Sequence, residues 1–216
     1  HSNEVWNPGF RQYAYNNAFA AAEVNADPGS NLASPATTDP IEWGRRRHLR
    51  RLLEAGRIFE EAFGSEAVNG RLRLVHAWWT IRAAEYGRVL GWMQQHYGRP
   101  ADKLYAIAKT QYFSTGAVAA NASVDDVIAA LGRSSDVQRS NTQAVAAVAE
   151  QYGLKMLAYE GGPGDTVGSQ TALANRIRAH RDPRLRELVR RDIEENWAPL
   201  GGGLHMYLEI ASAYSR

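Results

Sequence analysis

Short apolar segments alternate with longer amphipathic segments along this sequence, and that alternation limits the possible folds more than any other feature. Apolar residues spaced three and four positions apart predict helices, and short apolar runs between them predict strands. We expect strands at 1–6, 71–79, 103–113, 154–160 and 204–211, and helices at 12–24, 41–63, 81–97, 124–131, 135–152 and 184–197. Strands separated by helices form βαβ units, which build parallel sheets. The predicted fold class is therefore α/β, as a doubly wound open sheet or a (β/α)8 barrel.

Turn-forming residues set the boundaries of several of these elements. Asp39-Pro40 and Asp182-Pro183 each combine a helix N-cap with proline at the first helical position. Residues 7–40, which are rich in Asn, Ala, Pro, Gly and Ser, predict a long connection after the first strand. The turn at 161–164 is rich in glycine but lacks the G-x-G-x-x-G order and the lysine of a phosphate loop, so nucleotide binding is not favoured.

The composition excludes several classes of protein. The 216 residues, 44% of them hydrophobic, suit a single globular domain. No cysteine is present, which excludes disulfides, a thiolate zinc site and a cysteine nucleophile. The net charge of +2 gives no reason to expect a nucleic acid partner. No apolar run approaches the roughly 18 residues that a membrane helix needs, so no membrane partner is expected.

Polar and aromatic residues gather at the predicted carboxyl ends of the strands, where parallel α/β folds build their active sites. Glu4 lies at the end of the first strand and Glu160 at the end of the fourth. The other residues at these ends are Asn3, His76, Trp78, Trp79, Tyr112 and Tyr207. Each aromatic alone is typical of core packing, but a carboxylate that closes an apolar strand is costly unless paired or used. Two carboxylates with aromatic platforms predict chemistry on a glycosidic bond.

Two short motifs resemble a known family. Asn3-Glu4, within Ser-Asn-Glu-Val-Trp-Asn, resembles the end of strand four in the clan A glycoside hydrolases, where an Asn precedes the acid/base Glu. Tyr159-Glu160-Gly161-Gly162 resembles the end of strand seven, which carries the nucleophile. Two predicted strands lie between the motifs, and one helix and one strand follow them. The chain is also similar to large bacterial proteins described as cellulase-like or cellulose-binding.

The resemblance implies a retaining glycosidase and assigns a role to each candidate residue. Glu160 would be the nucleophile and Glu4 the acid/base, with their carboxyl groups about 5–5.5 Å apart. Asn3 would bind the sugar 2-hydroxyl, and Tyr112 would orient Glu160. The remaining implied contacts to a carbohydrate substrate are Trp6, His76, Trp78, Trp79 and Tyr207, the last standing where the family usually has tryptophan. No metal or organic cofactor is implied, and the family resemblance favours a secreted or cell-surface location.

The resemblance spans 1–216 but corresponds only to the second half of a barrel, strands four to eight. We therefore expect an open half-barrel that lacks its N-terminal half and is inactive alone, because a barrel closes only when every strand has two neighbours. Two other classes of function remain open. One is a carbohydrate-binding barrel that does not turn substrate over, and the other is a structural or interaction domain.

Overall fold

The computed structural model describes residues 4–79, 82–164 and 171–207. The helices are α1 (Arg11–Ala26), α2 (Pro40–Phe63), α3 (Ala83–Tyr97), α4 (Val124–Gln151), α5 (Leu173–Ala179) and α6 (Pro183–Arg191). The short 3-10 helices are η1 (Ser65–Ala67), η2 (Pro100–Asp102) and η4 (Ala198–Leu200). A π-helical segment, η3 (Asp192–Trp197), continues α6. The strands are β1 (Val75–Ala77), β2 (Ala106–Phe113), β3 (Lys155–Pro163) and β4 (Gly202–Tyr207).

The four strands form one sheet in the order β1-β2-β3-β4, and the pairs β1-β2 and β3-β4 are parallel. In the first pair His76 stands opposite Ile107, and in the last pair Gly161 stands opposite Tyr207. The α/β class with a parallel sheet is therefore confirmed. Among the described residues the sheet does not close into a barrel, and β1 and β4 are its edges.

The chain divides into two compact units that share β2, β3 and α4 between them. Unit 1 comprises residues 1–108 and 147–155, and unit 2 comprises residues 109–146 and 156–216. Unit 1 therefore holds β1 and the first residues of β2. Unit 2 holds the rest of β2, most of β3, and β4.

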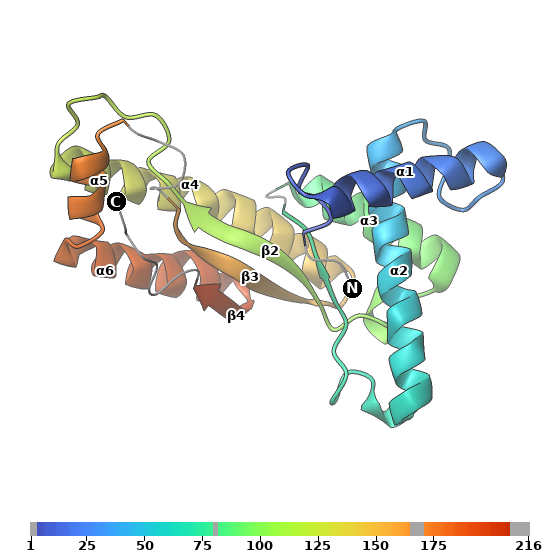
Figure 1. Ribbon diagram of the computed structural model, residues 1–216. Helices are drawn as coiled ribbons and strands as arrows, with labels where there is room; N and C mark the ends of the chain where they lie inside the picture. Colours follow the sequence, from blue (N-terminus) through green and yellow to red (C-terminus); the bar gives the residue numbers. More distant parts are fainter. Residues whose placement is uncertain (1–3, 80–81, 165–170, 208–216) are drawn as a thin grey trace. The chain divides into compact units, whose positions relative to one another are not determined.

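In unit 1, α1 packs against the first half of α2 (Figure 1). The buried Asn16 amide donates a 2.8 Å hydrogen bond to the carbonyl of Gly44 on α2. A side chain at position 44 would collide with Asn17, because a Cβ there would lie 1.9 Å from its Oδ1. Glycine at this point lets the two helices approach closely. On α3, the residues that turn into the core are Tyr86, Val89, Leu90, Trp92 and Met93.

In unit 2, a separate core forms where β2 meets the start of α4 and the two helices α5 and α6. Its fully buried members are Phe113, Ala122, Val127, Ile128, Leu131, Ala179 and Leu185. Figure 1 shows α5 and α6 (orange) beside the amino-terminal end of α4. Amphipathic spacing places the apolar residues of α4 and α6 on the faces that meet, which is the arrangement expected of helices that cover a sheet.

Three predictions about elements are corrected by the structure. Residues 4–6 form a turn rather than a strand, closed by a hydrogen bond from the Asn7 amide to the Glu4 carbonyl; residues 1–3 lie outside the described residues. Residues 124–151 form one continuous helix instead of two, since the turn at Gly132 packs against α6 near Leu188. The helix α5 was not expected. Within the predicted connection 7–40, α1 accounts for the first half.

Candidate functional site

Four aromatic rings meet in unit 1 where β1 ends, and we call Trp6, His48, His76 and Trp78 the ring cluster. Ring centroids lie 5.7 Å apart for Trp6 and Trp78, and 5.6 Å apart for His48 and His76. His76 also stacks on Trp78 at 6.3 Å. The structure therefore brings together three residues that the sequence predicted for sugar binding, Trp6, His76 and Trp78.

The position of Trp78 is fixed by the backbone of the neighbouring strand. Its amide donates a 3.1 Å hydrogen bond to the Ala108 carbonyl, which extends the β1–β2 ladder by one residue. The hydroxyl of Tyr86 on α3 lies 2.8 Å from both the Trp78 and Ala108 carbonyls, and this contact fixes the position of the end of β1. The Arg45 guanidinium lies over the Trp78 ring at 5.8 Å. That cation is balanced by the carboxylates of Glu42 at 3.0 Å and Glu85 at 3.2 Å.

Both histidines of the ring cluster are held neutral at pH 7. Burial lowers the pKa of His48 to about 4, although a hydrogen bond to the Ala77 backbone opposes this shift. Burial, and the neighbouring His48, lower the pKa of His76 to about 3. Nδ1 of His76 is buried and has no hydrogen-bond partner among the described residues. Neutral imidazoles can accept or donate hydrogen bonds without bringing a charge into the aromatic surroundings.

Glu4, two residues before Trp6 in the sequence, has a left-handed backbone conformation with φ of 45°. Non-glycine residues in this region are uncommon and often mark functional positions. The Glu4 carboxylate accepts a 2.9 Å hydrogen bond from the Asn7 side chain. Beside this turn is a cavity of about 240 Å³, lined among others by Val5, Gln12, Tyr15, Arg47 and His48.

In unit 2 the predicted site residues gather around the glycines of β3. Glu160 is half-buried and lies within β3, three residues before the strand ends at Pro163. A Cβ at Gly162 would lie 3.0 Å from the Tyr207 ring, and one at Gly164 would lie 3.1 Å from the Tyr112 ring. The two tyrosines, one from each strand beside β3, thus pack against the glycines that follow Glu160.

The remaining predicted residues are not part of either group. Trp79 is 62% exposed, which does not fit a ring held within a packed cluster. Asn3 lies outside the described residues. Glu4 belongs to unit 1 and Glu160 to unit 2, and the distance between their carboxyl groups stays a prediction.

Sequence reasoning missed a buried polar network in unit 2. It consists of Lys109 and Gln111 on β2, Ser135 and Thr142 on α4, and Asp192 and Asn196 on η3. Gln111 lies between the two charges: its Oε1 accepts from Lys109, and its Nε2 donates to Asp192 at 3.4 Å. Ser135 donates to Asp192 at 2.8 Å. The signal in the sequence was the polar run Lys109-Thr110-Gln111 between apolar residues of one strand, since a buried lysine requires a partner.

Burial gives the Lys109 amine a pKa closer to neutral pH than that of an exposed lysine. Burial lowers the pKa of Lys109 to about 8, and the opposite charge of Asp192 limits that fall. The Lys109 ammonium also lies 5.9 Å from the Trp197 ring. A π-helical segment supplies Asp192, Asn196 and Trp197, and such segments are often found at functional positions.

The described residues contain no cluster of three or more His, Asp or Glu side chains that could hold a metal ion. No helix among the described residues is both long and apolar enough to cross a membrane. Comparisons of the chain with protein-family models, with curated proteins and with solved structures found no match.

Proposed function

We propose that the chain contributes to a retaining glycoside hydrolase acting on a β-linked glycan, with Glu160 as nucleophile and Glu4 as acid/base. The observation that carries the proposal is the setting of Glu160. A half-buried carboxylate lies on a parallel strand, and tyrosines from the strands on both sides pack on the glycines that follow it. Glycine at these positions lets the tyrosine rings approach the strand closely, and tyrosine offers both a ring face and a hydroxyl.

The reaction proceeds by double displacement. A Glu160 carboxylate oxygen attacks the anomeric carbon while the bond to the leaving oxygen breaks, and Glu4 gives its proton to that oxygen. The product of this step is a glycosyl ester of Glu160. Glu4, now ionised, takes a proton from water, and the water oxygen attacks the anomeric carbon and releases Glu160. Tyr112 is assigned to orient Glu160 and Tyr207 to contact the sugar.

The ring cluster supplies the second part of the proposed site. Trp6 follows Glu4 by two residues, so the acid/base and a sugar platform come from one turn. Neutral His48 and His76 suit an uncharged ligand, because no buried charge must be compensated by the substrate. Asn3 is assigned to the 2-hydroxyl and Trp79 to a more distant sugar, as its exposed ring allows.

Within this proposal β1, β2, β3 and β4 correspond to barrel strands five to eight, and residues 1–6 to the end of strand four. The edges of the sheet at β1 and β4 would then be the positions where the rest of a barrel adds. A carbohydrate-binding barrel without turnover would use the same strands, and it is separated from the enzyme by the experiment that follows.

The test uses the longest polypeptide that contains these 216 residues, assayed on aryl β-glycosides and β-glucans. Glu160→Ala should lower kcat by at least about 10³-fold, and added azide should restore turnover and give the inverted glycosyl azide. Glu4→Ala should spare aryl glycosides with good leaving groups, because these need no protonation. Glu187→Ala, an exposed carboxylate on α6, is the matched control and should leave kcat unchanged.

Two results would change the assignment. Undiminished activity in Glu160→Ala would show that another residue is the nucleophile. Saturable binding of β-glucans with no turnover in any form would favour the non-catalytic barrel, and absence of both binding and turnover would leave the structural or interaction domain.

A further inference from the structure

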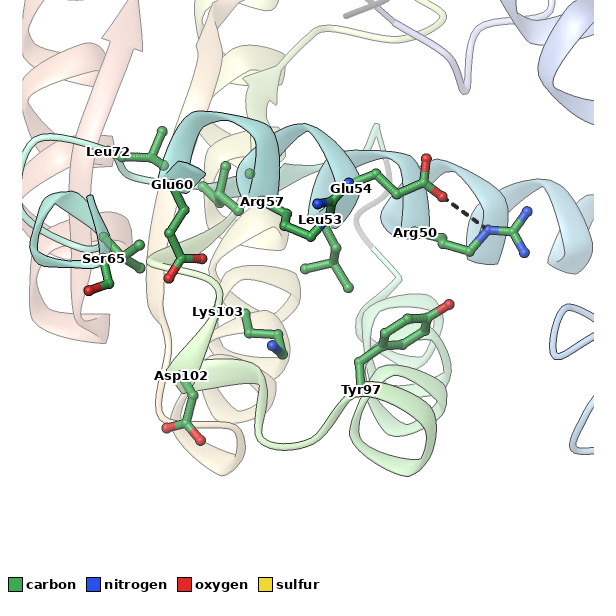
Figure 2. Close-up of a pocket in the computed structure, with 13 residues that line it drawn as sticks. Arg50, Leu53, Glu54, Arg57, Glu60, Ser65, Leu72, Tyr97, Asp102 and Lys103 are labelled. Carbon is green, nitrogen blue, oxygen red and sulfur yellow. Dashed lines mark ion pairs between the residues drawn. The ribbon is translucent and has the colours of Figure 1, made fainter. Parts of the chain in front are cut away.

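A second cavity lies in unit 1 at the amino ends of β1 and β2, away from the ring cluster at the carboxyl end of β1. It has a volume of about 530 Å³. Its walls are α2 on one side, and the segments before β1 and before β2 on the other (Figure 2). This volume is within the usual range of about 300–1,000 Å³ for sites that bind small molecules.

The floor of the cavity is apolar. It is formed by the half-buried side chains Leu53, Val68, Leu72 and Leu74, with Gly56 of α2 between them. A Cβ at Gly56 would lie 2.2 Å from Leu74, so the glycine lets Leu74 sit directly against the helix. Figure 2 shows Leu53 pointing from α2 into the open space, with the Tyr97 ring across from it. An apolar group of a ligand would replace water over this surface.

Three of the charged side chains around the rim, Arg50, Glu54 and Arg57, are already neutralised within the protein. Arg50 pairs with Glu23 and Glu54, and Arg57 pairs with Glu61. The hydroxyl of Tyr97 accepts a 2.8 Å hydrogen bond from Asn31. These groups hold the cavity walls in place and are not available to a charged ligand without losing those partners.

Three charges on the rim are not neutralised. The side chains of Glu60, Asp102 and Lys103 have no hydrogen-bond or ion-pair partner in the described part of the chain. Figure 2 shows the Lys103 ammonium and the Glu60 carboxylate directed toward the space below α2, whereas the Asp102 carboxylate points away from α2. A ligand that carries both a carboxylate and an ammonium would satisfy this pair of charges.

We propose that this cavity binds a small zwitterion with an apolar body, of the chemical class of apolar amino acids and short apolar peptides. The ligand carboxylate meets Lys103, its ammonium meets Glu60, and its side chain covers the leucine floor. Lys103 and Glu60 are the two charges directed into the space, so a purely anionic or purely cationic ligand would leave one of them unmatched. The site is independent of the proposed glycosidase activity.

The proposal is tested by calorimetric titration of the whole chain with phenylalanine and with the dipeptide Leu-Phe, each also in N-acetylated and C-amidated form. The free amino acid and the dipeptide distinguish the two sources of the same chemistry. Capping either end should weaken binding by about tenfold or more, as expected for loss of one hydrogen bond to a charged group. Cellobiose is the uncharged comparison and should not compete for the cavity.

Variants then assign each contact. Lys103→Gln should remove the effect of C-amidation only, and Glu60→Gln should remove the effect of N-acetylation only. Arg99→Gln and Glu150→Gln, which change exposed charges outside the cavity, should keep the parent affinities. Leu53→Trp, whose ring would fill the space, should abolish binding of every probe. Equal affinity for capped and uncapped probes, binding of cellobiose alone, or no saturable binding would each overturn the proposal.

Discussion

Unit 1 buries two histidines, His48 and His76, packed against tryptophan rings, whereas unit 2 buries a lysine, Lys109, surrounded by hydrogen-bonding side chains. All three have pKa values lowered by burial, to about 4, about 3 and about 8. At pH 7 the histidines are therefore neutral and the lysine is still charged. Unit 1 tolerates these two histidines by keeping them uncharged, and unit 2 tolerates Lys109 by giving its charge a partner.

The difference has consequences for stability that can be separated by pH. A base with a lowered pKa in the folded state binds its proton more readily when the chain unfolds. Its stabilising contribution is complete above the unfolded pKa and is lost as the pH falls toward the folded pKa. That loss falls between pH 6.5 and about 4 for His48, between pH 6.5 and about 3 for His76, and between pH 10.5 and about 8 for Lys109.

The largest expected effect is acid destabilisation of unit 1. Two histidines with lowered pKa values change the free energy of unfolding by up to about 2.7 kcal/mol per pH unit, so about 4 kcal/mol should be lost between pH 7 and 5. Urea denaturation followed by tryptophan fluorescence measures this, because Trp6, Trp43, Trp78, Trp79 and Trp92 all belong to unit 1. His48→Gln should flatten this pH dependence. A urea midpoint that is equal at the two pH values would contradict the burial of neutral histidines.

Removal of the buried charge in unit 2 should have the next largest effect. Lys109→Met keeps the length of the side chain but leaves Asp192 buried without its cation, which should cost about 3 kcal/mol. Adding Asp192→Asn should recover part of that loss, since the remaining polar groups can bond to an amide. Lys155→Met, at an exposed lysine over the Tyr105 ring, is the control and should cost less than about 1 kcal/mol. Urea unfolding followed by circular dichroism gives all three values, and an unchanged Lys109→Met would show that Asp192 does not depend on this lysine.

Alkaline pH should have a smaller effect, which arises from Lys109 in unit 2. Here stability should increase as the pH is raised, whereas the histidines of unit 1 cause a loss as the pH is lowered. Stability should rise by about 2 kcal/mol between pH 8 and 9.5, because the folded chain releases the Lys109 proton before the unfolded chain does. The rise should end near pH 10, where burial holds the pKa of Tyr86 well above its usual value and ionised tyrosine favours unfolding. Lys109→Met should remove the rise. If the parent chain loses stability steadily from pH 8, the ammonium of Lys109 is better accommodated than its burial indicates.

The elements that could be predicted were those with local signals. Asp39-Pro40 and Gly64 bound α2 as expected, because capping and termination depend on residues within one turn. The continuity of helix α4 could not be predicted from the residues of that segment alone. Ser135, which would favour a helix start, is instead buried in α4, where it donates to Asp192 and accepts from Asn196. Contacts with residues more than fifty positions away decided that segment.

The candidate site shows the same division. The strand-end rule found His76 and Trp78, because parallel strands place such residues at one edge of the sheet. It did not find His48, which comes from α2 and meets them only in the tertiary structure. Lys109 was visible as a charged residue inside a strand, but its partners Thr142 and Asp192 are far along the chain. The periodicity of apolar residues predicts which faces of helices and strands are buried, but it does not predict which other elements those faces contact.

The smallest expected effect compares the two helix starts that share the Asp-Pro motif, one in each unit. Asp39 accepts a 2.9 Å hydrogen bond from the Ile41 amide, and Asp182 accepts one of equal length from the Arg184 amide. Asp39→Ala should destabilise the chain by about 1 kcal/mol, and Asp39→Ser should restore it, because serine can accept the same bond. At Asp182 the Arg184 side chain also binds the carboxylate and lowers its pKa to about 2. Asp182→Ser should therefore restore only part of what Asp182→Ala loses, and the difference should shrink in high salt. Equal rescue by serine at both positions would show that the arginine contact adds nothing to the cap.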